Sequence, residues 1–304
     1  MSAPDSPWHA PLLSVAVEVA DSGTRLSALV GDAPDGRRIQ ERRPTPLTAA
    51  DAPRALADFA LRALREAGLL NAPERQSVPA PISLGLALWG QVNHATGVVH
   101  SARGLPDWDE LPLGQRLQEL VAEVTVENAT NAAAVAECAL GVAAGSESAL
   151  YLDIGRHITS GYVAHGEVVR GAHDNAGQIG HWRVAARGPR CACGAEGHLD
   201  PLASAQAIVR AMIGRASDSD ASLDAILRIT HRRAEALTAA QVVRLADEGD
   251  SIAASVVGVA VEGLAAALAN CIAALDPEII VLSGSFGDQW DTLIARIQER
   301  VRAW

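Results

Sequence analysis

Four side chains that could bind a metal lie close together between residues 176 and 200, in the stretch AGQIGHWRVAARGPRCACGAEGHLD. Cys191, Cys193 and His198 fall within eight consecutive positions, and His181 lies ten residues before the first cysteine. Two thiolates and two imidazoles form a donor set that suits tetrahedral Zn²⁺. The pattern therefore predicts a zinc site. The alternative is a loop with unrelated cysteines and surface histidines.

The spacing of these donors predicts a compact knuckle. One residue separates the two cysteines, which is tighter than in a zinc finger. Gly188, Gly194 and Gly197 would allow the turns that such a short loop needs. Because cysteine is usually scarce and buried, two cysteines this close together among glycines favour the metal site.

The composition indicates a soluble globular protein with enough residues for two domains. The chain has 304 residues, of which 49% are hydrophobic and 20% are charged. A formal net charge of −11 argues against direct binding of nucleic acid, which needs a basic surface. All 25 basic residues are arginines, so no lysine is available for Schiff-base chemistry or for a P-loop.

Cysteine usage and the apolar segments predict a cytoplasmic protein. Cys138 and Cys271 lie in apolar helical runs and are expected to be buried thiols outside any disulfide framework. The first residues are polar and acidic and contain no signal-peptide core. Residues 251–275 are long and apolar enough to raise a membrane helix, but they include Glu262 and Asn270. We therefore expect a buried domain helix and no contact with a membrane.

Hydrophobic patterning predicts two α/β lobes, residues 1–125 and 126–304, with a ligand cleft between them. In the first lobe the expected elements are a hairpin (12–19 and 26–30), a helix (49–69), a strand (82–88), an irregular loop (97–112), a short helix (113–120) and a strand (121–126). In the second they are a helix ending near Leu140, strands at 149–154, 161–164 and 167–170, the knuckle, several helices and a strand at 279–282.

The chain carries, in order, a hairpin with a small-residue turn, GLPDWDELPL, VENATNAAAVAE, AGQIGH and CxCGxxGH. This set resembles the ROK family of bacterial sugar kinases and sugar-responsive repressors, over residues 12 to 304. The resemblance implies the two-lobed actin-like ATPase (ribonuclease H-like) fold, with a sugar in the interdomain cleft. It also implies that three small-residue turns hold ATP.

The resemblance further implies a structural zinc bound by one histidine and three cysteines. His181, Cys191 and Cys193 fall on matching positions, and His198 replaces the third cysteine. An imidazole in place of a thiolate preserves tetrahedral coordination, so we expect the zinc to be retained.

The catalytic motif differs from that of the family. Family members have Glu-Asn-Asp at the end of the fourth long strand, where the asparagine holds a sugar hydroxyl and the aspartate takes its proton. This chain has Glu127-Asn128-Ala129, and a methyl group cannot act as a general base. Asp107 and Asp109 are the nearby carboxylates, but both belong to a flanking loop. We therefore expect no catalytic residue in the base position.

The first nucleotide-binding turn is only partly retained. Gly23 and Thr24 match the family pattern, but Ala20 occupies the position of the carboxylate that steers Mg²⁺. Asp21 lies one place away, which on a strand means the opposite face.

The second and third turns differ in how much they have changed. The second spans residues 155–161, where Gly155 and Gly161 remain but His157 and Thr159 replace glycines that would let backbone N–H groups approach a phosphate. The third, around Gly284, is only mildly altered.

The sugar pocket implied by the family is partly retained, in Gly90, Asn128, Gln178, His181 and Asp200. Gln178 and Asp200 each replace a family glutamate. The first offers hydrogen bonds without charge, and the second is shorter by one methylene. His181 would bind zinc through one ring nitrogen and offer the other to the sugar. Trp108 is a further lining candidate, with core packing as the alternative.

The three altered parts are those that position phosphate and metal for phosphoryl transfer. We therefore expect a sugar-binding pseudo-kinase or sensor with structural Zn²⁺. The alternatives are an active kinase for a hexose or N-acetylhexosamine, which would need ATP and Mg²⁺, and a transcriptional regulator. Regulators of the family carry a helix-turn-helix segment before this domain, and we expect none here. Family members end with a further strand and a closing helix, which we also do not expect here. The family also implies a homo-oligomer, either a dimer or a tetramer.

Overall fold

The computed structural model describes residues 13–20, 23–30, 37–44, 48–66, 68, 80–102, 104–217 and 219–303. They form two compact units, one of Met1–Ala133 with Arg170–Ala176 and one of Ala134–Val169 with Gly177–Trp304. This division differs from the predicted boundary at residue 125, which would cut a strand of the first sheet. The short segment Arg170–Ala176 also belongs with the first unit although it lies in the second half of the sequence.

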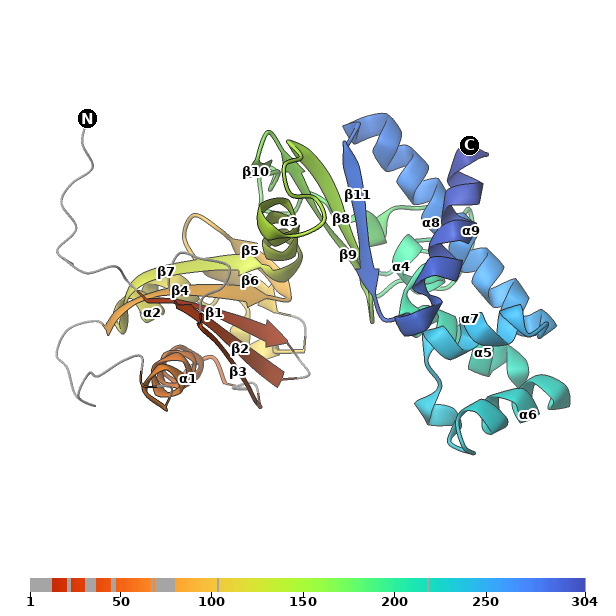
Figure 1. Ribbon diagram of the computed structural model, residues 1–304, viewed down its shortest axis with the longest axis horizontal. Coiled ribbons are helices and arrows are strands. Elements are labelled where there is room, and N and C mark those ends of the chain that lie inside the picture. The colour runs from red at the N-terminus through yellow and green to blue at the C-terminus, as the bar shows by residue number, and fades with distance from the viewer. Residues whose placement is uncertain are drawn as a thin grey trace. The chain divides into compact units, whose positions relative to one another are not determined.

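The first unit is built on a five-stranded sheet with the strand order β3-β2-β1-β4-β7 (Figure 1). Its strands are β1 (Leu13–Ala20), β2 (Gly23–Val30), β3 (Arg37–Arg43), β4 (Ala80–Leu88) and β7 (Val121–Asn128). Strand β2 runs antiparallel to both β1 and β3, whereas β1, β4 and β7 are parallel. The parallel strands therefore end at the same edge of the sheet, where Asn128 pairs with Leu88.

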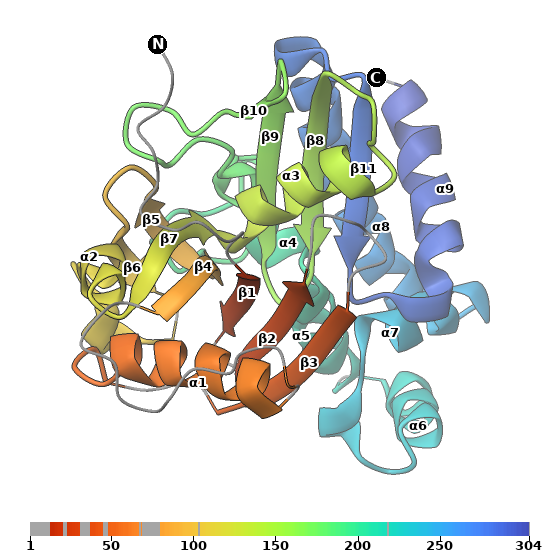
Figure 2. The ribbon, with the colours of Figure 1, turned by 60° about the vertical axis from the view of Figure 1, so that its left-hand side comes forward.

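Helix α1 (Ala52–Glu66) lies along the sheet of the first unit (Figure 2). Alternate residues of β1 and β4 are buried, as expected for strands with one face on a core, and they pack with the apolar face of α1. The other elements are β5 (Gly90–Asn93), β6 (Val98–Ala102), the 3₁₀ turn η1 (Pro106–Trp108) and α2 (Leu113–Gln118). The irregular loop predicted from residue 97 was wrong for β6, which pairs with β5 in a hairpin.

The second unit has a four-stranded sheet with the order β10-β9-β8-β11. Its strands are β8 (Ser148–Ile154), β9 (Ile158–Ala164), β10 (Glu167–Val168) and β11 (Ile279–Gly284). The helices are α3 (Ala129–Leu140, shared with the first unit), α4 (Leu199–Ala203), α5 (Ala205–Ala216), α6 (Asp220–Ile229), α7 (Ala239–Asp247), α8 (Ser251–Leu275) and α9 (Trp290–Arg302). Three 3₁₀ turns, η2 (Ile179–His181), η3 (Ala234–Ala236) and η4 (Gly287–Gln289), complete the list.

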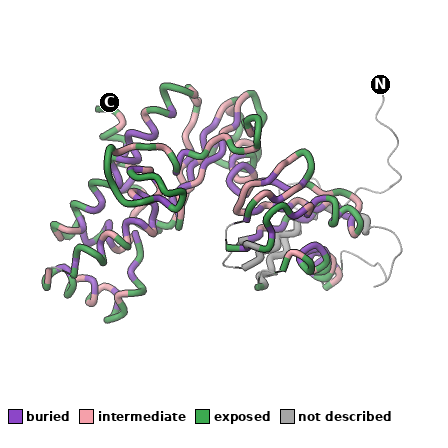
Figure 3. Tube along the Cα trace, turned by 180° about the vertical axis from the view of Figure 1, so that it is seen from behind, coloured by how far each residue is buried: buried purple, intermediate pink, exposed green. Residues whose placement is uncertain are grey.

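The sheet of the second unit is covered on both faces. Leu150, Leu152 and Ile154 of β8 point to one face and pack in a core with residues of α5, α7, α8 and α9. The opposite face of β8 and β9 packs against α3, which crosses in front of these strands in Figure 2. In Figure 3 the buried residues of this unit gather on its strands and on the inner sides of its helices.

Helix α8 is the central helix of the second unit. It is apolar and long enough to cross a bilayer, but 61% of its most apolar window is buried within the protein. This agrees with the predicted domain helix. Cys271 on this helix is fully buried, as predicted, whereas Cys138 on α3 is only half-buried. Asp250 caps the start of α8 by accepting a hydrogen bond from the N–H of Ala253 at 2.8 Å.

Candidate functional site

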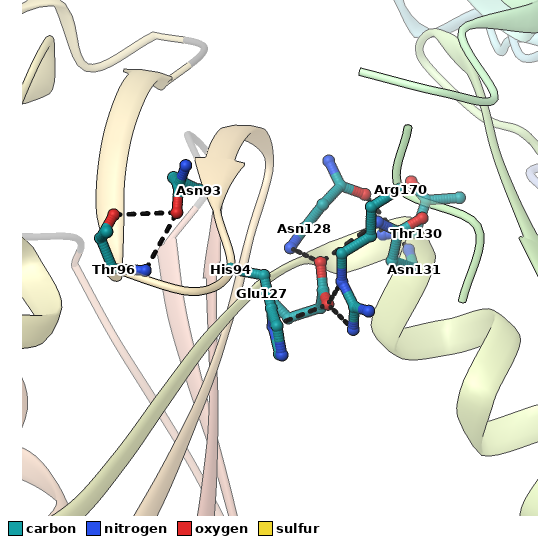
Figure 4. A network of polar contacts seen from close by, with 8 residues as sticks. All are labelled: Asn93, His94, Thr96, Glu127, Asn128, Thr130, Asn131 and Arg170. Atoms are coloured by element: carbon teal, nitrogen blue, oxygen red, sulfur yellow. Dashed lines mark hydrogen bonds and ion pairs between the residues drawn. The ribbon is translucent and has the colours of Figure 1, made fainter. Parts of the chain in front are cut away.

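Glu127 is the centre of a polar network in the first unit (Figure 4). The residue is only 9% exposed. Its Oε1 accepts hydrogen bonds from the backbone N–H of Asn128 at 2.8 Å and from Nδ2 of Asn131 at 3.1 Å. Its Oε2 accepts from Nε and Nη2 of Arg170 at 2.9 and 2.7 Å, and Nδ1 of His94 lies 3.1 Å away. A buried carboxylate needs such partners to offset its lost hydration.

Asn128, predicted to hold a sugar hydroxyl, is the last residue of β7 and caps α3. Its Oδ1 accepts from the backbone N–H groups of Thr130 at 2.8 Å and Asn131 at 3.2 Å, and its Nδ2 donates to the carbonyl of Gly90 at 2.7 Å. These contacts use both lone pairs of the amide oxygen and one of the two amide hydrogens. Asn128 is therefore arranged to donate one further hydrogen bond and not to accept one.

Gly90, another predicted sugar-binding residue, serves this arrangement through its backbone. It is the first residue of β5, and a Cβ atom there would lie 2.1 Å from the carbonyl oxygen of Ser101. No other residue fits so close to the neighbouring strand. The glycine thus lets β5 and β6 approach each other while its own carbonyl holds the amide of Asn128.

Ala129, predicted to stand where the family has its base, is the first residue of α3 and is 9% exposed. It directly follows the asparagine that the network holds in place. The neighbouring Asn128 is held by several hydrogen bonds, but the side chain of Ala129 itself is only a methyl group.

The first predicted nucleotide turn lies partly outside the described residues, because Asp21 and Ser22 are among those left out. Gly23 and Thr24 begin β2, where Gly23 pairs with Ala20 of β1. The carboxylate of Glu18, further back on β1, accepts a hydrogen bond from Nε1 of Trp89 at 3.2 Å.

The second predicted turn is shorter than expected. It consists only of residues 155–157, and Gly161 lies inside strand β9. The prediction of a turn up to Gly161 was wrong because the β-branched residues at 158 and 159 favour a strand. Within the turn, the N–H of Gly155 donates to the carbonyl of His157 at 3.2 Å, so the loop closes on itself.

The third predicted turn lies beside the second. Strands β8 and β11 are parallel neighbours, and Gly284 at the end of β11 pairs with Ile154 at the end of β8. The N–H of Ser285 also donates to the carbonyl of Ile154 at 3.4 Å. The sheet therefore brings two of the predicted nucleotide turns together.

Asp200, predicted to contact the sugar, supports the second turn. Its Oδ1 accepts a hydrogen bond from the N–H of Ile158 at 2.7 Å, and its Oδ2 lies 3.3 Å from Nδ1 of His157. The carboxylate thereby joins the start of α4 to the start of β9. The ring of His157 is thereby paired with this carboxylate.

The knuckle is closed by two backbone contacts. The N–H of Leu199 donates to the carbonyl of Trp182 at 2.9 Å, and the N–H of Val184 donates to the carbonyl of Gly197 at 2.9 Å. A tighter turn follows Cys191, whose carbonyl accepts from the N–H of Gly194 at 2.9 Å. The contacts of Leu199 and Val184 bring the two flanks of the loop side by side. The turn after Cys191 folds the cysteines towards these flanks.

The four predicted metal donors meet in one cluster. One donor atom from each of His181, Cys191, Cys193 and His198 lies within 4.8 Å of every other. Sγ of Cys191 is 3.5 Å from Nδ1 of His181, and Sγ of Cys193 is 3.4 Å from Nδ1 of His198. Tetrahedral zinc with bonds of about 2.3 Å to sulfur and 2.0–2.1 Å to nitrogen separates such donors by about 3.6 Å. The donor set and its spacing therefore fit zinc.

Cys191 and Cys193 differ in environment, since the first is buried and the second is exposed. Burial raises the pKa of the Cys191 thiol. The pocket alone therefore favours the neutral thiol, whereas a bound divalent cation would favour the thiolate that ligates it. Since Nδ1 of each histidine faces a cysteine, each Nε2 is on the far side of its ring.

The two remaining predicted residues have different settings. Gln178 is an exposed residue, and its backbone carbonyl accepts a hydrogen bond from the N–H of His181 at 3.0 Å. Trp108 is fully buried in the core of the first unit. The structure thus supports core packing for Trp108.

Sequence reasoning missed the partners of Glu127. Arg170 lies 43 positions further along the chain, and no local pattern links the two. The one available signal was an acid at the end of an otherwise apolar strand, which requires a cationic or hydrogen-bonding partner when buried. That signal gives the kind of partner without its position.

Comparison with known proteins agrees with the fold. The ROK family model matches residues 40–304. A glucokinase of Halalkalibacterium halodurans is 33% identical over 225 residues, which cover 73% of this chain and 67% of the relative. The DNA-binding transcriptional repressor Mlc of Escherichia coli is 24% identical over 221 residues, which cover 72% of this chain and 52% of the repressor.

A solved structure extends the likeness over almost the whole chain. The ROK hexokinase from Thermus thermophilus superposes with a TM-score of 0.71 at 29% identity, covering 96% of this chain and 90% of that one. The predicted α/β fold of ROK sugar kinases is thereby confirmed. The chain belongs to the ROK family.

Proposed function

We propose that this chain binds a sugar and that its capacity for phosphoryl transfer is impaired. The observation that carries the proposal is Ala129, which follows the firmly held Asn128 at the start of α3. A positioned hydroxyl-binding residue is retained, while the general base beside it is replaced by a methyl group.

Three side chains support the sugar-binding part. Asn128 has one amide hydrogen left for a ligand, and Gln178 is an exposed residue with a side-chain amide. The resemblance to the family implies that His181 binds the metal through one ring nitrogen and contacts the sugar through the other. Hydroxyl groups both donate and accept hydrogen bonds, so neutral amide and imidazole groups are each suited to contact a carbohydrate. The glucokinases among the relatives favour a hexose as the ligand.

The second nucleotide turn supports the impairment. Phosphate binding in such turns relies on backbone N–H groups that point to the anion. Here the N–H of Gly155 is used within the turn, and the side chain of His157 is paired with Asp200. The turn offers less to a triphosphate than a glycine-rich one would.

We also propose that the knuckle holds a structural Zn²⁺ through His181, Cys191, Cys193 and His198. The support is the spacing of the donor atoms and the burial of Cys191. In this role the metal fixes the loop that carries Gln178 and Asp200 and takes no part in chemistry. ATP and Mg²⁺ would be needed only for residual kinase activity.

A panel of hexoses and amino sugars tests the proposal. Isothermal calorimetry without nucleotide should detect binding of at least one sugar. Sugar-dependent ADP release with Mg-ATP should be at least about 10²-fold below that of the Halalkalibacterium glucokinase assayed in parallel, as expected for the loss of a general base. Turnover equal to that relative would overturn the impairment, and the absence of binding by every sugar would overturn the sugar-binding part.

An active sugar kinase is the second candidate, and the 33% identity to a glucokinase favours it. It predicts robust ADP release in the same assay. The likeness to Mlc supports a regulator as a third candidate, but the net charge of −11 disfavours direct contact with DNA. A dimer or tetramer remains a prediction from the family.

A further inference from the structure

We infer that Glu127 and Arg170 are positioning residues that set the ligand-binding geometry of Asn128. This inference rests on the proposed sugar binding. Neither side chain is expected to touch the sugar. They act by fixing the backbone and the side-chain direction of the asparagine that does.

Glu127 acts on Asn128 from two sides. Its Oε1 accepts from the backbone N–H of Asn128, and the same oxygen accepts from the side chain of Asn131. The backbone N–H of Asn131 in turn donates to Oδ1 of Asn128. The carboxylate therefore closes a ring of hydrogen bonds around the residue (Figure 4). Within this ring the amide of Asn128 has one orientation, with Nδ2 directed to the carbonyl of Gly90.

Arg170 holds the carboxylate of Glu127 in the orientation that this ring requires. Its Nε and Nη2 both bind Oε2 of Glu127, which leaves Oε1 to the two asparagines. Two charge-assisted hydrogen bonds to one oxygen fix the position of Oε2 and are stronger than neutral ones. Because Glu127 is only 9% exposed, losing the arginine would leave a buried charge with weaker partners, chiefly His94.

The segment that carries Arg170 is itself held in the first unit. The carbonyl of Arg170 accepts from the N–H of Ala176 at 2.9 Å, which closes the segment into a loop. Nε2 of Gln91 donates to the carbonyl of His173 at 3.3 Å. The guanidinium therefore approaches Glu127 from a fixed backbone, as a positioning residue must.

Calorimetric sugar affinity of three variants tests the inference. We expect Arg170→Met to weaken sugar binding about tenfold or more, in the range seen when partners of ligating residues are removed. Arg170→Lys keeps the charge but not the two-point pair and should recover part of the affinity. Arg296→Met is the matched control, because it removes an ion pair with Asp247 in the second unit and should leave sugar affinity unchanged.

A double-mutant cycle with Asn128→Ala separates positioning from general stability. If Arg170 acts through Asn128, then Arg170→Met should change the affinity of the Asn128→Ala protein by less than about twofold. Equal losses with and without the asparagine would overturn the inference. So would wild-type affinity in a folded Arg170→Met protein.

A variant that keeps the shape of the network covers the case in which Arg170→Met does not fold. Glu127→Gln retains the oxygen that faces Asn128 but removes the charge that orients it, and we expect it to weaken sugar binding as well. Unchanged affinity in this variant would overturn the inference. The proposed function fails separately, through the absence of sugar binding by the wild-type protein.

Discussion

At the scale of single residues, position 129 is where one change has the clearest chemical meaning. The residue begins α3, and a carboxylate at a helix N-terminus is favoured by the helix dipole. We predict that Ala129→Asp raises sugar-dependent ADP release above the wild-type level, because it supplies the missing base. The increase in rate should stay below the full effect of a general base, about 10²–10⁴-fold, since the predicted nucleotide turns are also altered.

Ala129→Asn is the control for this change. Asparagine has nearly the same size and hydrogen-bonding reach as aspartate but cannot accept the proton of a hydroxyl at neutral pH. Coupled-enzyme detection of ADP compares the two variants. Equal rates for Asp and Asn would show that the loss of the base is not what limits turnover.

Cys191 is the buried cysteine of the predicted metal cluster, and its substitution tests the metal site. We predict about one zinc per chain in the wild-type protein and nearly none in Cys191→Ser, measured by elemental analysis. A thiolate is a softer zinc ligand than the serine hydroxyl that would replace it. If the metal contributes about 3 kcal/mol to the second unit, its loss should lower the melting temperature by about 6–12 °C.

Cys271 provides the control for the metal prediction. Burial raises the pKa of its thiol to about 11, so it is neutral and shielded at pH 7–8 and should resist alkylation. Cys271→Ala should keep its zinc. Exposed Cys193, in contrast, should become reactive to iodoacetamide when the metal is removed. Full zinc content in Cys191→Ser would exclude the proposed ligand set.

At the scale of elements, the knuckle depends on one close backbone approach. Gly197 has φ = +73°, and a Cβ atom there would lie 2.0 Å from the carbonyl oxygen of Ala185. Gly194 also has a positive φ, +94°, but nothing lies within 4 Å of its Cβ position. Both glycines therefore have a positive φ, but only at Gly197 would a Cβ atom collide with a neighbouring backbone atom.

We predict that Gly197→Ala disrupts the knuckle and lowers its zinc content, whereas Gly194→Ala retains the metal. The second variant should cost only about 1–2 kcal/mol, the strain of a left-handed alanine. Thermal unfolding and zinc analysis measure both effects. Equal metal loss in the two variants would mean that backbone strain, and not the contact with Ala185, governs the loop.

The elements that sequence reasoning identified are those with a strong local pattern. The apolar run at 251–275 marks a helix that the structure contains at that position. Strand β3 was missed because its sequence, RRIQERR, has the charge of a solvated loop and is held by pairing with β2. Short strands such as β6 depend in the same way on a partner that the local sequence does not reveal.

The two candidate sites also differ in whether their residues are close together in the sequence. The metal cluster was predictable because its donors lie within 18 positions and their residue types are distinctive. The network around Glu127 was not, since its arginine comes from a distant loop that joins the first unit only after folding. Donor type can be read from sequence, whereas tertiary pairing of common residues requires the fold.

At the scale of the whole molecule, the two units have separate hydrophobic cores. One core gathers residues of β1, β4, α1 and β6, and the other gathers residues of β8, α5, α7 and α8. The four metal donors all belong to the second unit. Leu199 and Val184 of the knuckle also pack within 3.5 Å of where a Cβ at Gly263 of α8 would lie, so the loop is part of that unit's core.

Metal removal should therefore destabilise one unit selectively. We predict that a zinc chelator lowers the unfolding temperature of the second unit and leaves that of the first nearly unchanged. Amide hydrogen exchange resolves the two, because α8 and α4 should exchange faster while α1 and β4 keep their protection. Cys191→Ser should show the same pattern before chelation and no further change after it. A uniform loss of protection would mean that the two cores unfold as one, and no loss would mean that the cluster does not stabilise the fold.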